Sequence, residues 1–144
     1  MRCTLLSAIL LVIGLATGCQ TDFGPGAEHG LVVYVPGAGN VDRGEIGLEE
    51  GLDRVGFRGA FITLRWTYSY NVAIDQSVRA FARLASKRLA GLLQDYIDRH
   101  PGREVNVVGL SAGTGIAIWA VEDLRPEYKV NNVVLLSSSL ATDY

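Results

Sequence analysis

Segments typical of β-strands alternate with segments typical of helices over most of this 144-residue chain, and this alternation constrains the fold more than any other feature. The first strand segment, Leu31–Val35, is a continuous apolar run that stops at Pro36 and Gly37. The other expected strands are residues 61–66, 104–109 and 130–136, and the expected helices lie around 48–55, from about 75 to 100, and at 112–124. Such an order forms βαβ units, so the sequence predicts an α/β fold with a parallel sheet flanked by helices.

The two earlier helices are expected from the spacing of their apolar residues. Leu48, Leu52 and Val55 follow one another at helical intervals, and Gly56 is a suitable stop. The long helix has one apolar stripe, made of Val78, Phe81, Ala85, Leu89, Leu92, Leu93 and Tyr96. Its basic residues, Arg79, Arg83, Lys87 and Arg88, lie off that stripe. They are interpreted as a solvated face, with membrane contact as the alternative.

The first 18 residues have the pattern of a signal peptide. Arg2 precedes an apolar segment at 5–15, which is too short to span a bilayer, and small residues lead to Cys19. This end resembles the lipobox of bacterial lipoproteins. The resemblance implies export, acylation of Cys19 and a lipid anchor in the cell envelope, at the outer membrane because Gln20 follows the cysteine. Simple secretion and an uncleaved anchor are the alternatives.

After the signal peptide, the sequence predicts a lipidated tether at 19–30 and one domain at 31–144. Residues 20–30 are rich in Gly and Pro and have no apolar period, so we expect packed structure to begin at Leu31. The content of 49% hydrophobic and 19% charged residues suits a chain that buries a core. With only two cysteines and a net charge of −2, we expect no metal, no cofactor and no nucleic-acid partner.

The segment Gly109-Leu110-Ser111-Ala112-Gly113 lies between an expected strand and an expected helix. A serine on such a sharp turn is exposed above the sheet, and the flanking glycines allow close packing. The Ala112 N–H, at the start of the helix, is then available to a developing oxyanion. A second donor is expected from the small-residue loop at 36–40, where we choose the Ala38 N–H.

These segments together resemble the α/β-hydrolase superfamily. Residues 31–136 look like the third to sixth strands of that fold, with 109–113 as the nucleophile elbow and 36–40 as the oxyanion loop. The resemblance implies a serine hydrolase that acts on carboxylic esters or lipid-like acyl substrates through Ser111. It also implies an acid and then a histidine after the nucleophile.

The catalytic histidine expected from the resemblance is missing after Ser111. His29 and His100 both precede Ser111, and each precedes a strand, so we expect them at the opposite edge of the sheet. Asp143 follows the last strand, on the catalytic side. The triad is therefore expected to be incomplete in this chain. The apolar strand around 133–136 has no later element to cover it, which favours the N-terminal part of a larger hydrolase.

Several alternatives stay open at this point. The chain could be a non-catalytic envelope lipoprotein that uses a degenerate hydrolase scaffold for binding, with Ser111 on an ordinary turn. The Gly37-Ala38-Gly39 loop could bind a dinucleotide, although Asp42 takes the third glycine place and Arg65-Trp66 supplies no ribose-binding acid. The aromatic residues Trp66, Tyr68 and Tyr70 could line a pocket or serve packing. Residues 137–139 are interpreted as a polar loop.

Overall fold

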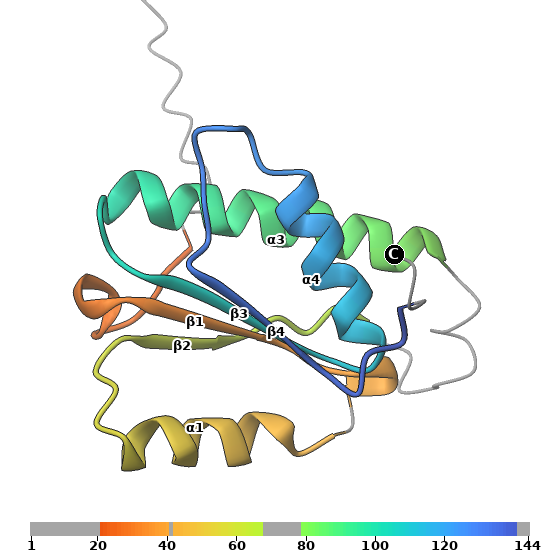
Figure 1. Ribbon diagram of the computed structural model, residues 1–144, viewed down its shortest axis with the longest axis horizontal. Coiled ribbons are helices and arrows are strands. Elements are labelled where there is room, and N and C mark those ends of the chain that lie inside the picture. Colours follow the sequence, from red (N-terminus) through yellow and green to blue (C-terminus); the bar gives the residue numbers. More distant parts are fainter. Residues whose placement is uncertain (1–20, 41, 68–78, 141–144) are drawn as a thin grey trace, which may run out of the picture.

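The computed structural model describes residues 21–40, 42–67 and 79–140. They form a parallel sheet between two layers of helices (Figure 1). In chain order the elements are η1 (Ala27–His29), β1 (Leu31–Val35), η2 (Ala38–Asn40), α1 (Gly44–Arg54), β2 (Ala60–Thr63), α3 (Arg79–Arg99), β3 (Val105–Leu110), α4 (Ala112–Glu122) and β4 (Asn132–Leu136), where η is a 3-10 helix. The predicted α/β class is therefore confirmed.

The four strands pair in the order β2-β1-β3-β4, and all three pairings are parallel. Val33 in β1 stands opposite Ile62 on one side and Val107 on the other, and Val107 stands opposite Val133. The chain leaves β1 toward β2 on one side and later crosses to β3 on the other. The strand order thus reverses between β1 and β3, and all carboxyl ends of the strands meet at one edge, called the carboxyl edge below.

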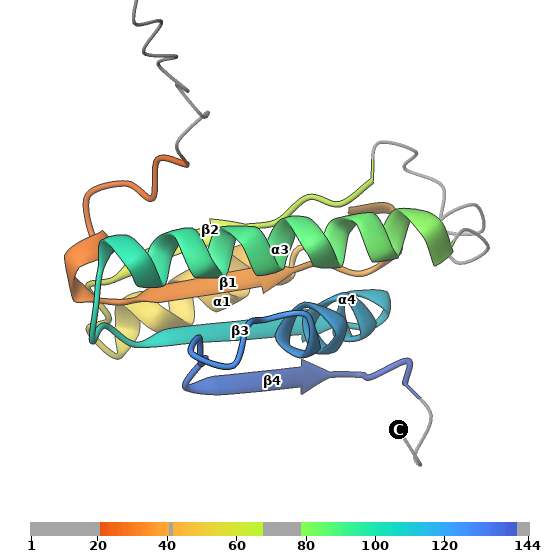
Figure 2. The same cartoon turned by 90° about the horizontal axis from the view of Figure 1, so that it is seen from above.

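The core lies on both faces of the sheet because β1 is buried along its whole length. Leu31, Val33 and Val35 belong to the larger cluster with buried residues of α3 and α4. Val32 and Tyr34 point to the other face, where Leu48 and Leu52 of α1 pack. Figures 1 and 2 show the same division, with α3 and α4 on one face and α1 on the other. A central parallel strand is expected to be apolar on both faces.

Packed structure begins before Leu31, so the expectation of an unpacked tether up to residue 30 is wrong for its last part. Phe23 and Ala27 are buried in the larger core cluster, and η1 follows them. The ring of Phe23 meets Tyr96 edge to face, and the Tyr96 hydroxyl donates a hydrogen bond to the Ala27 carbonyl. These contacts are made with α3, which is about 70 residues later, so local composition could not indicate them.

The structure shows which of the apolar side chains expected in the core are in fact buried. Leu89 and Leu93 of the long helix are fully buried, as predicted. Phe81, which was placed on the same apolar stripe, is 49% exposed. Val55 is 80% exposed because α1 ends at Arg54 and the chain turns away at Gly56, whose φ is +76°. The predicted stop at Gly56 is thus confirmed, whereas the buried roles of Val55 and Phe81 are wrong.

The strand β4 forms one edge of the sheet and is mostly exposed. Val134 and Leu136 are each 44% exposed, and within the described residues no element covers this side. The expectation of an uncovered apolar strand is confirmed for these residues. In the described ranges, the structure contains no helix with the length and hydropathy needed to cross a bilayer.

Candidate active site

Ser111 occupies the turn between β3 and α4 in an unusual backbone conformation. β3 ends at Leu110, α4 begins at Ala112, and Ser111 between them has φ +50° and ψ −118°. A residue with a side chain seldom adopts this combination, because the Cβ then crowds the neighbouring backbone. Such conformations cost about 1–3 kcal/mol and persist only where surrounding contacts enforce them. The sharp turn predicted at 109–113 is confirmed as a feature of the backbone.

The two glycines around Ser111 make this turn possible. A Cβ on Gly113 would lie 2.2 Å from the carbonyl oxygen of Val35 in β1, and one on Gly109 would lie 2.9 Å from the Gly113 carbonyl oxygen. Neither contact is sterically allowed. Gly113 therefore lets α4 approach β1, and Gly109 lets the same helix fold back over β3.

Hydrogen bonds with β4, with α4 and with the segment after β4 hold Ser111 in place. The Ser111 N–H donates to the Leu136 carbonyl at 2.9 Å. The Ser111 carbonyl accepts bonds from the Thr114 N–H at 3.0 Å and from the hydroxyls of Thr114 and Ser139. Thr114 is completely buried. Sequence reasoning missed Thr114 and Ser139; the available signal was the position of residues 137–139 directly after a strand expected beside β3.

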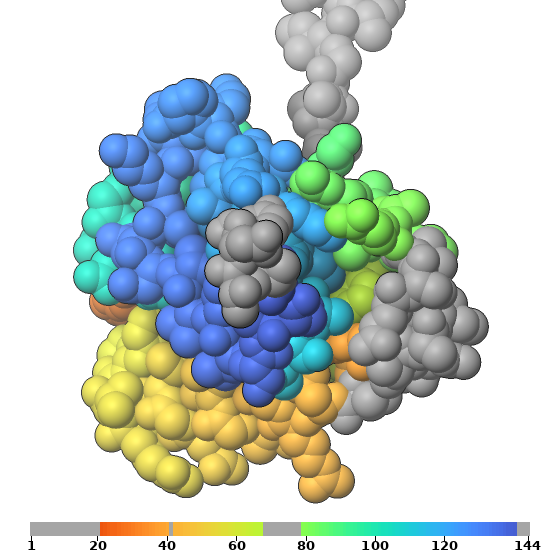
Figure 3. All heavy atoms as spheres, turned by 45° about the vertical axis from the view of Figure 1, so that its right-hand side comes forward, coloured from red at the N-terminus to blue at the C-terminus, as the bar shows by residue number. Residues whose placement is uncertain are grey.

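The loop after β1 lies directly against Ser111. A Cβ built on Gly37 would be 3.5 Å from the Ser111 Cβ, so Gly37 leaves space beside the serine. Ala38 follows within this loop, and Ala112 is the first residue of α4. Among the described residues, no hydrogen bond involves the amide N–H of either alanine. Figure 3 shows this loop (orange), the elbow (cyan) and the segment after β4 (blue) meeting on one surface.

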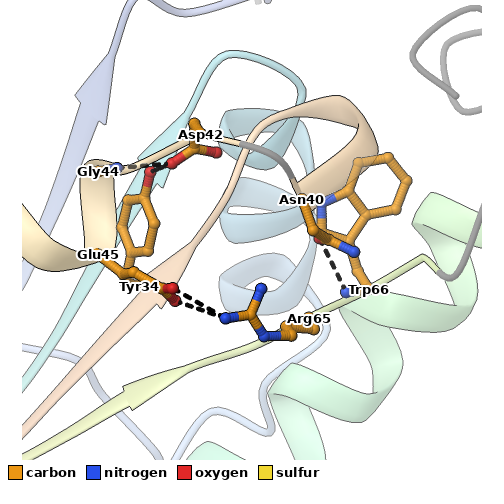
Figure 4. A network of polar contacts seen from close by, with 7 residues as sticks. All are labelled: Tyr34, Asn40, Asp42, Gly44, Glu45, Arg65 and Trp66. Atoms are coloured by element: carbon orange, nitrogen blue, oxygen red, sulfur yellow. Dashed lines mark hydrogen bonds and ion pairs between the residues drawn. The ribbon is translucent and has the colours of Figure 1, made fainter. Parts of the chain in front are cut away.

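The Asp42 carboxylate links the beginning of this loop to the first residue of α1. Its carboxylate accepts a bond from the Gly37 N–H at 2.9 Å. It also accepts bonds from the Gly44 N–H at 2.9 Å and from the Tyr34 hydroxyl (Figure 4). Burial and the Asp42 carboxylate raise the pKa of Tyr34 above its usual value, so the phenol stays protonated. The carboxylate takes the place that a phosphate group would need at the start of α1. This arrangement argues against the dinucleotide alternative.

Asn40 and Trp66 connect this loop to the segment after β2. Asn40 has φ +49° and is buried; its amide nitrogen donates to the Thr67 carbonyl, and its amide oxygen accepts from the Trp66 N–H at 3.4 Å. The Trp66 indole donates to the Pro36 carbonyl at 2.9 Å. Trp66 is only 5% exposed, so the packing interpretation holds for it. Tyr68 and Tyr70 lie outside the described residues.

An ion pair lies beside this network at the surface. A terminal nitrogen of Arg65 contacts both carboxylate oxygens of Glu45 at 2.8 and 3.0 Å (Figure 4). The pair joins the segment after β2 to the first turn of α1. Both side chains are partly exposed, so the contribution of this pair to stability is small.

Both histidines lie at the amino end of the sheet, away from Ser111. His29 is in η1 just before β1, and His100 follows α3 and stacks on Tyr96 with 4.7 Å between ring centroids. A strand of five or six residues at about 3.3 Å each separates that end from Ser111, roughly 16–20 Å. Neither imidazole reaches the Ser111 hydroxyl. Asp143 and Cys19 lie outside the described residues, among which no cluster of His, Cys, Asp and Glu is placed to hold a metal ion.

No protein-family model matches this chain, and no curated protein is similar to it in sequence.

Proposed function

We propose that this chain is a serine hydrolase of the α/β-hydrolase type, whose substrates are carboxylic esters or lipid-like acyl compounds. The observation that supports this proposal best is the strained conformation of Ser111 between β3 and α4, beside a small-residue loop. Strain of this kind is retained where it places a reactive group. In the proposed reaction the Ser111 hydroxyl oxygen attacks the acyl carbonyl, which forms an acyl-serine ester and releases the alcohol.

The amides of Ala38 and Ala112 are proposed as the oxyanion donors. The first N–H groups of a helix lack intrahelical partners and lie at the positive end of its dipole, which describes the Ala112 N–H at the start of α4. The Ala38 N–H follows Gly37, which has no side chain beside Ser111. Two such donors stabilise the negative charge that develops in acyl transfer.

The place of the site in the sheet supports the same proposal. In open parallel sheets, ligands bind at the carboxyl edge where the strand order reverses. Here that point lies between β1 and β3, and the two segments that leave these strands there are the loop at 36–40 and the elbow. A substrate at this position would contact both proposed oxyanion donors.

Among the described residues, no imidazole lies near the proposed nucleophile Ser111. We therefore expect slow acylation, since a hydroxyl without a base is a weak nucleophile. The position of both histidines favours a second candidate function, a non-catalytic envelope protein that uses this scaffold for binding. For either function we retain the proposal of export and a lipid anchor at Cys19, which holds the protein at a membrane surface.

Acylation with p-nitrophenyl butyrate separates the two functions. The intact chain is incubated with the ester, with imidazole in the buffer as an external base, and digested for mass spectrometry. We expect one butyryl group on the peptide that contains Ser111 and release of p-nitrophenolate. The Ser111→Ala variant should lack this group, and Ser138→Ala, with a nearby exposed serine, should retain it. No modification of Ser111, or equal ester turnover by Ser111→Ala, would contradict the hydrolase proposal.

A further inference from the structure

We propose that one face of α3 binds the surface of an anionic lipid bilayer. This face, called the basic apolar face, consists of Phe81, Arg83, Leu84, Lys87 and Arg88 in the first half of the helix. All five residues are exposed. The inference goes beyond the proposed hydrolase activity and does not require it, because it concerns a different surface of the molecule.

The apolar part of this face is unusual for a helix in contact with water. Leu84 is 60% exposed and Phe81 is 49% exposed, although the same helix buries Leu89 and Leu93 completely. At 100° per residue, Leu84 lies nearly opposite the buried side of α3, and Phe81 is its neighbour one turn earlier. Leu84 thus lies on the outward side of α3, and Phe81 lies beside it at the border of the buried stripe.

The charged residues of α3 on either side of these two side chains are all positive. Arg79, Arg83, Lys87 and Arg88 lie within ten residues, and the sequence has no Asp or Glu from residue 76 to 94. Within the described part of the chain, none of these four cations is in an ion pair. The Arg83 guanidinium lies over the Trp119 ring of α4, 4.4 Å from its centroid. The whole chain has a net charge of −2, so this part of α3 is more positive than the chain as a whole.

Cations arranged around exposed apolar side chains fit a lipid surface better than a nucleic acid. The cations are attracted to anionic headgroups, while Phe81 and Leu84 are long enough to enter the boundary between headgroups and acyl chains. A nucleic-acid site would use the cations but would leave both apolar side chains in water. The combination of charge and apolar exposure therefore selects an anionic bilayer.

The first described residues of the chain contact the C-terminal end of the same helix, α3. The Arg99 guanidinium, near the end of α3, donates to the Thr21 carbonyl at 2.7 Å. Phe81 and Arg99 are five helical turns apart, so they lie on the same side of α3. Cys19 is two residues before Thr21. The described chain therefore begins beside the C-terminal end of α3, the helix that carries the basic apolar face.

An environment-sensitive label tests the face without the lipid anchor. In the full chain with Cys3→Ser and Cys19→Ser, either Leu84→Cys or Val55→Cys is labelled with a nitrobenzoxadiazole dye. Val55 is 80% exposed and follows α1, on the other side of the sheet, so it is the matched control. Vesicles of phosphatidylglycerol and phosphatidylcholine are added, and pure phosphatidylcholine vesicles serve for comparison.

We expect a blue shift of the emission from position 84 with phosphatidylglycerol vesicles, reversed by high salt, and no shift from position 55. Each cation near an anionic surface contributes roughly a fivefold preference. The measurement is repeated at the vesicle concentration that gives half of the maximal shift. At that concentration we expect no shift in the triple variant Arg83→Gln, Lys87→Gln, Arg88→Gln. No shift at position 84, an equal shift at position 55, or a shift at position 84 with duplex DNA but not with vesicles would overturn the proposal.

Discussion

Single residues decide whether the turn at Ser111 can form. The conformation of Ser111 depends on how closely α4 approaches β1 and β3, and that approach depends on the missing side chains of Gly113 and Gly109. The sequence allowed this role to be predicted, because glycines on both sides of a serine between a strand and a helix have few other uses. It gave no indication that the Thr114 hydroxyl would bond to the Ser111 carbonyl.

Replacement of Gly113 by alanine should destabilise the protein strongly. The new Cβ would lie 2.2 Å from the Val35 carbonyl oxygen and 2.6 Å from that of Pro36, and backbone atoms cannot yield as a side chain does. We expect a loss of roughly 2–3 kcal/mol in the free energy of unfolding, measured by urea denaturation. The matched control is Gly115→Ala, whose Cβ would meet only Leu140 at 3.7 Å. That variant should keep or gain stability, by up to about 1 kcal/mol. Equal losses in both variants would contradict the claim that the approach of α4 to β1 requires glycine at position 113.

At the scale of elements, the site depends on connections between loops that are far apart in sequence. The alternation of apolar strands and amphipathic helices predicted the parallel sheet, and the Gly-rich turns marked the ends of β1 and β3. Phe23 could not be placed, because its burial depends on Tyr96 in α3. Phe81 was misplaced because it lies at the border of the apolar stripe, where periodicity does not distinguish core from surface. The hydrogen bonds between Asn40 and the segment after β2 could not be predicted from the neighbouring sequence either.

The connection made by Asn40 can be tested with an isosteric change. In Asn40→Asp the side chain loses the N–H that donates to the Thr67 carbonyl, and a carboxylate oxygen faces that carbonyl instead. We expect a loss of roughly 1–3 kcal/mol in the free energy of unfolding. Because the loop with Ala38 is then less well held, acylation of Ser111 by p-nitrophenyl butyrate should also slow.

The control for this change is Asn132→Asp at the exposed end of β4. Asn132 donates a hydrogen bond to Asn106 at the surface, so its loss should change the free energy of unfolding by less than about 0.5 kcal/mol. Both variants are compared by urea denaturation and by the rate of acylation. If Asn40→Asp behaves like Asn132→Asp in both measurements, the loop after β1 does not depend on this amide.

For the molecule as a whole, the helices cover both faces of the central strand β1 but leave the edge strand β4 exposed. Val134, Leu135 and Leu136 are each more than a third exposed, and within the described residues no strand pairs with their free side (Figure 2). An exposed apolar edge strand is a template for pairing with another chain. Helices on both faces do not prevent this, because the free N–H and C=O groups point sideways in the plane of the sheet.

The open edge should therefore make the protein self-associate, and a charge on β4 should reduce this tendency. We expect Val134→Lys to lower light scattering and to raise the monomer fraction in sedimentation velocity, since lysine on an edge strand opposes pairing. Val55→Lys is the control, because Val55 is exposed at 80% but follows α1 rather than lying on the sheet edge. It adds the same charge, so a general solubility effect would appear in both variants. If Val55→Lys reduces association as much as Val134→Lys, the contact between chains does not depend on the exposed apolar residues of β4.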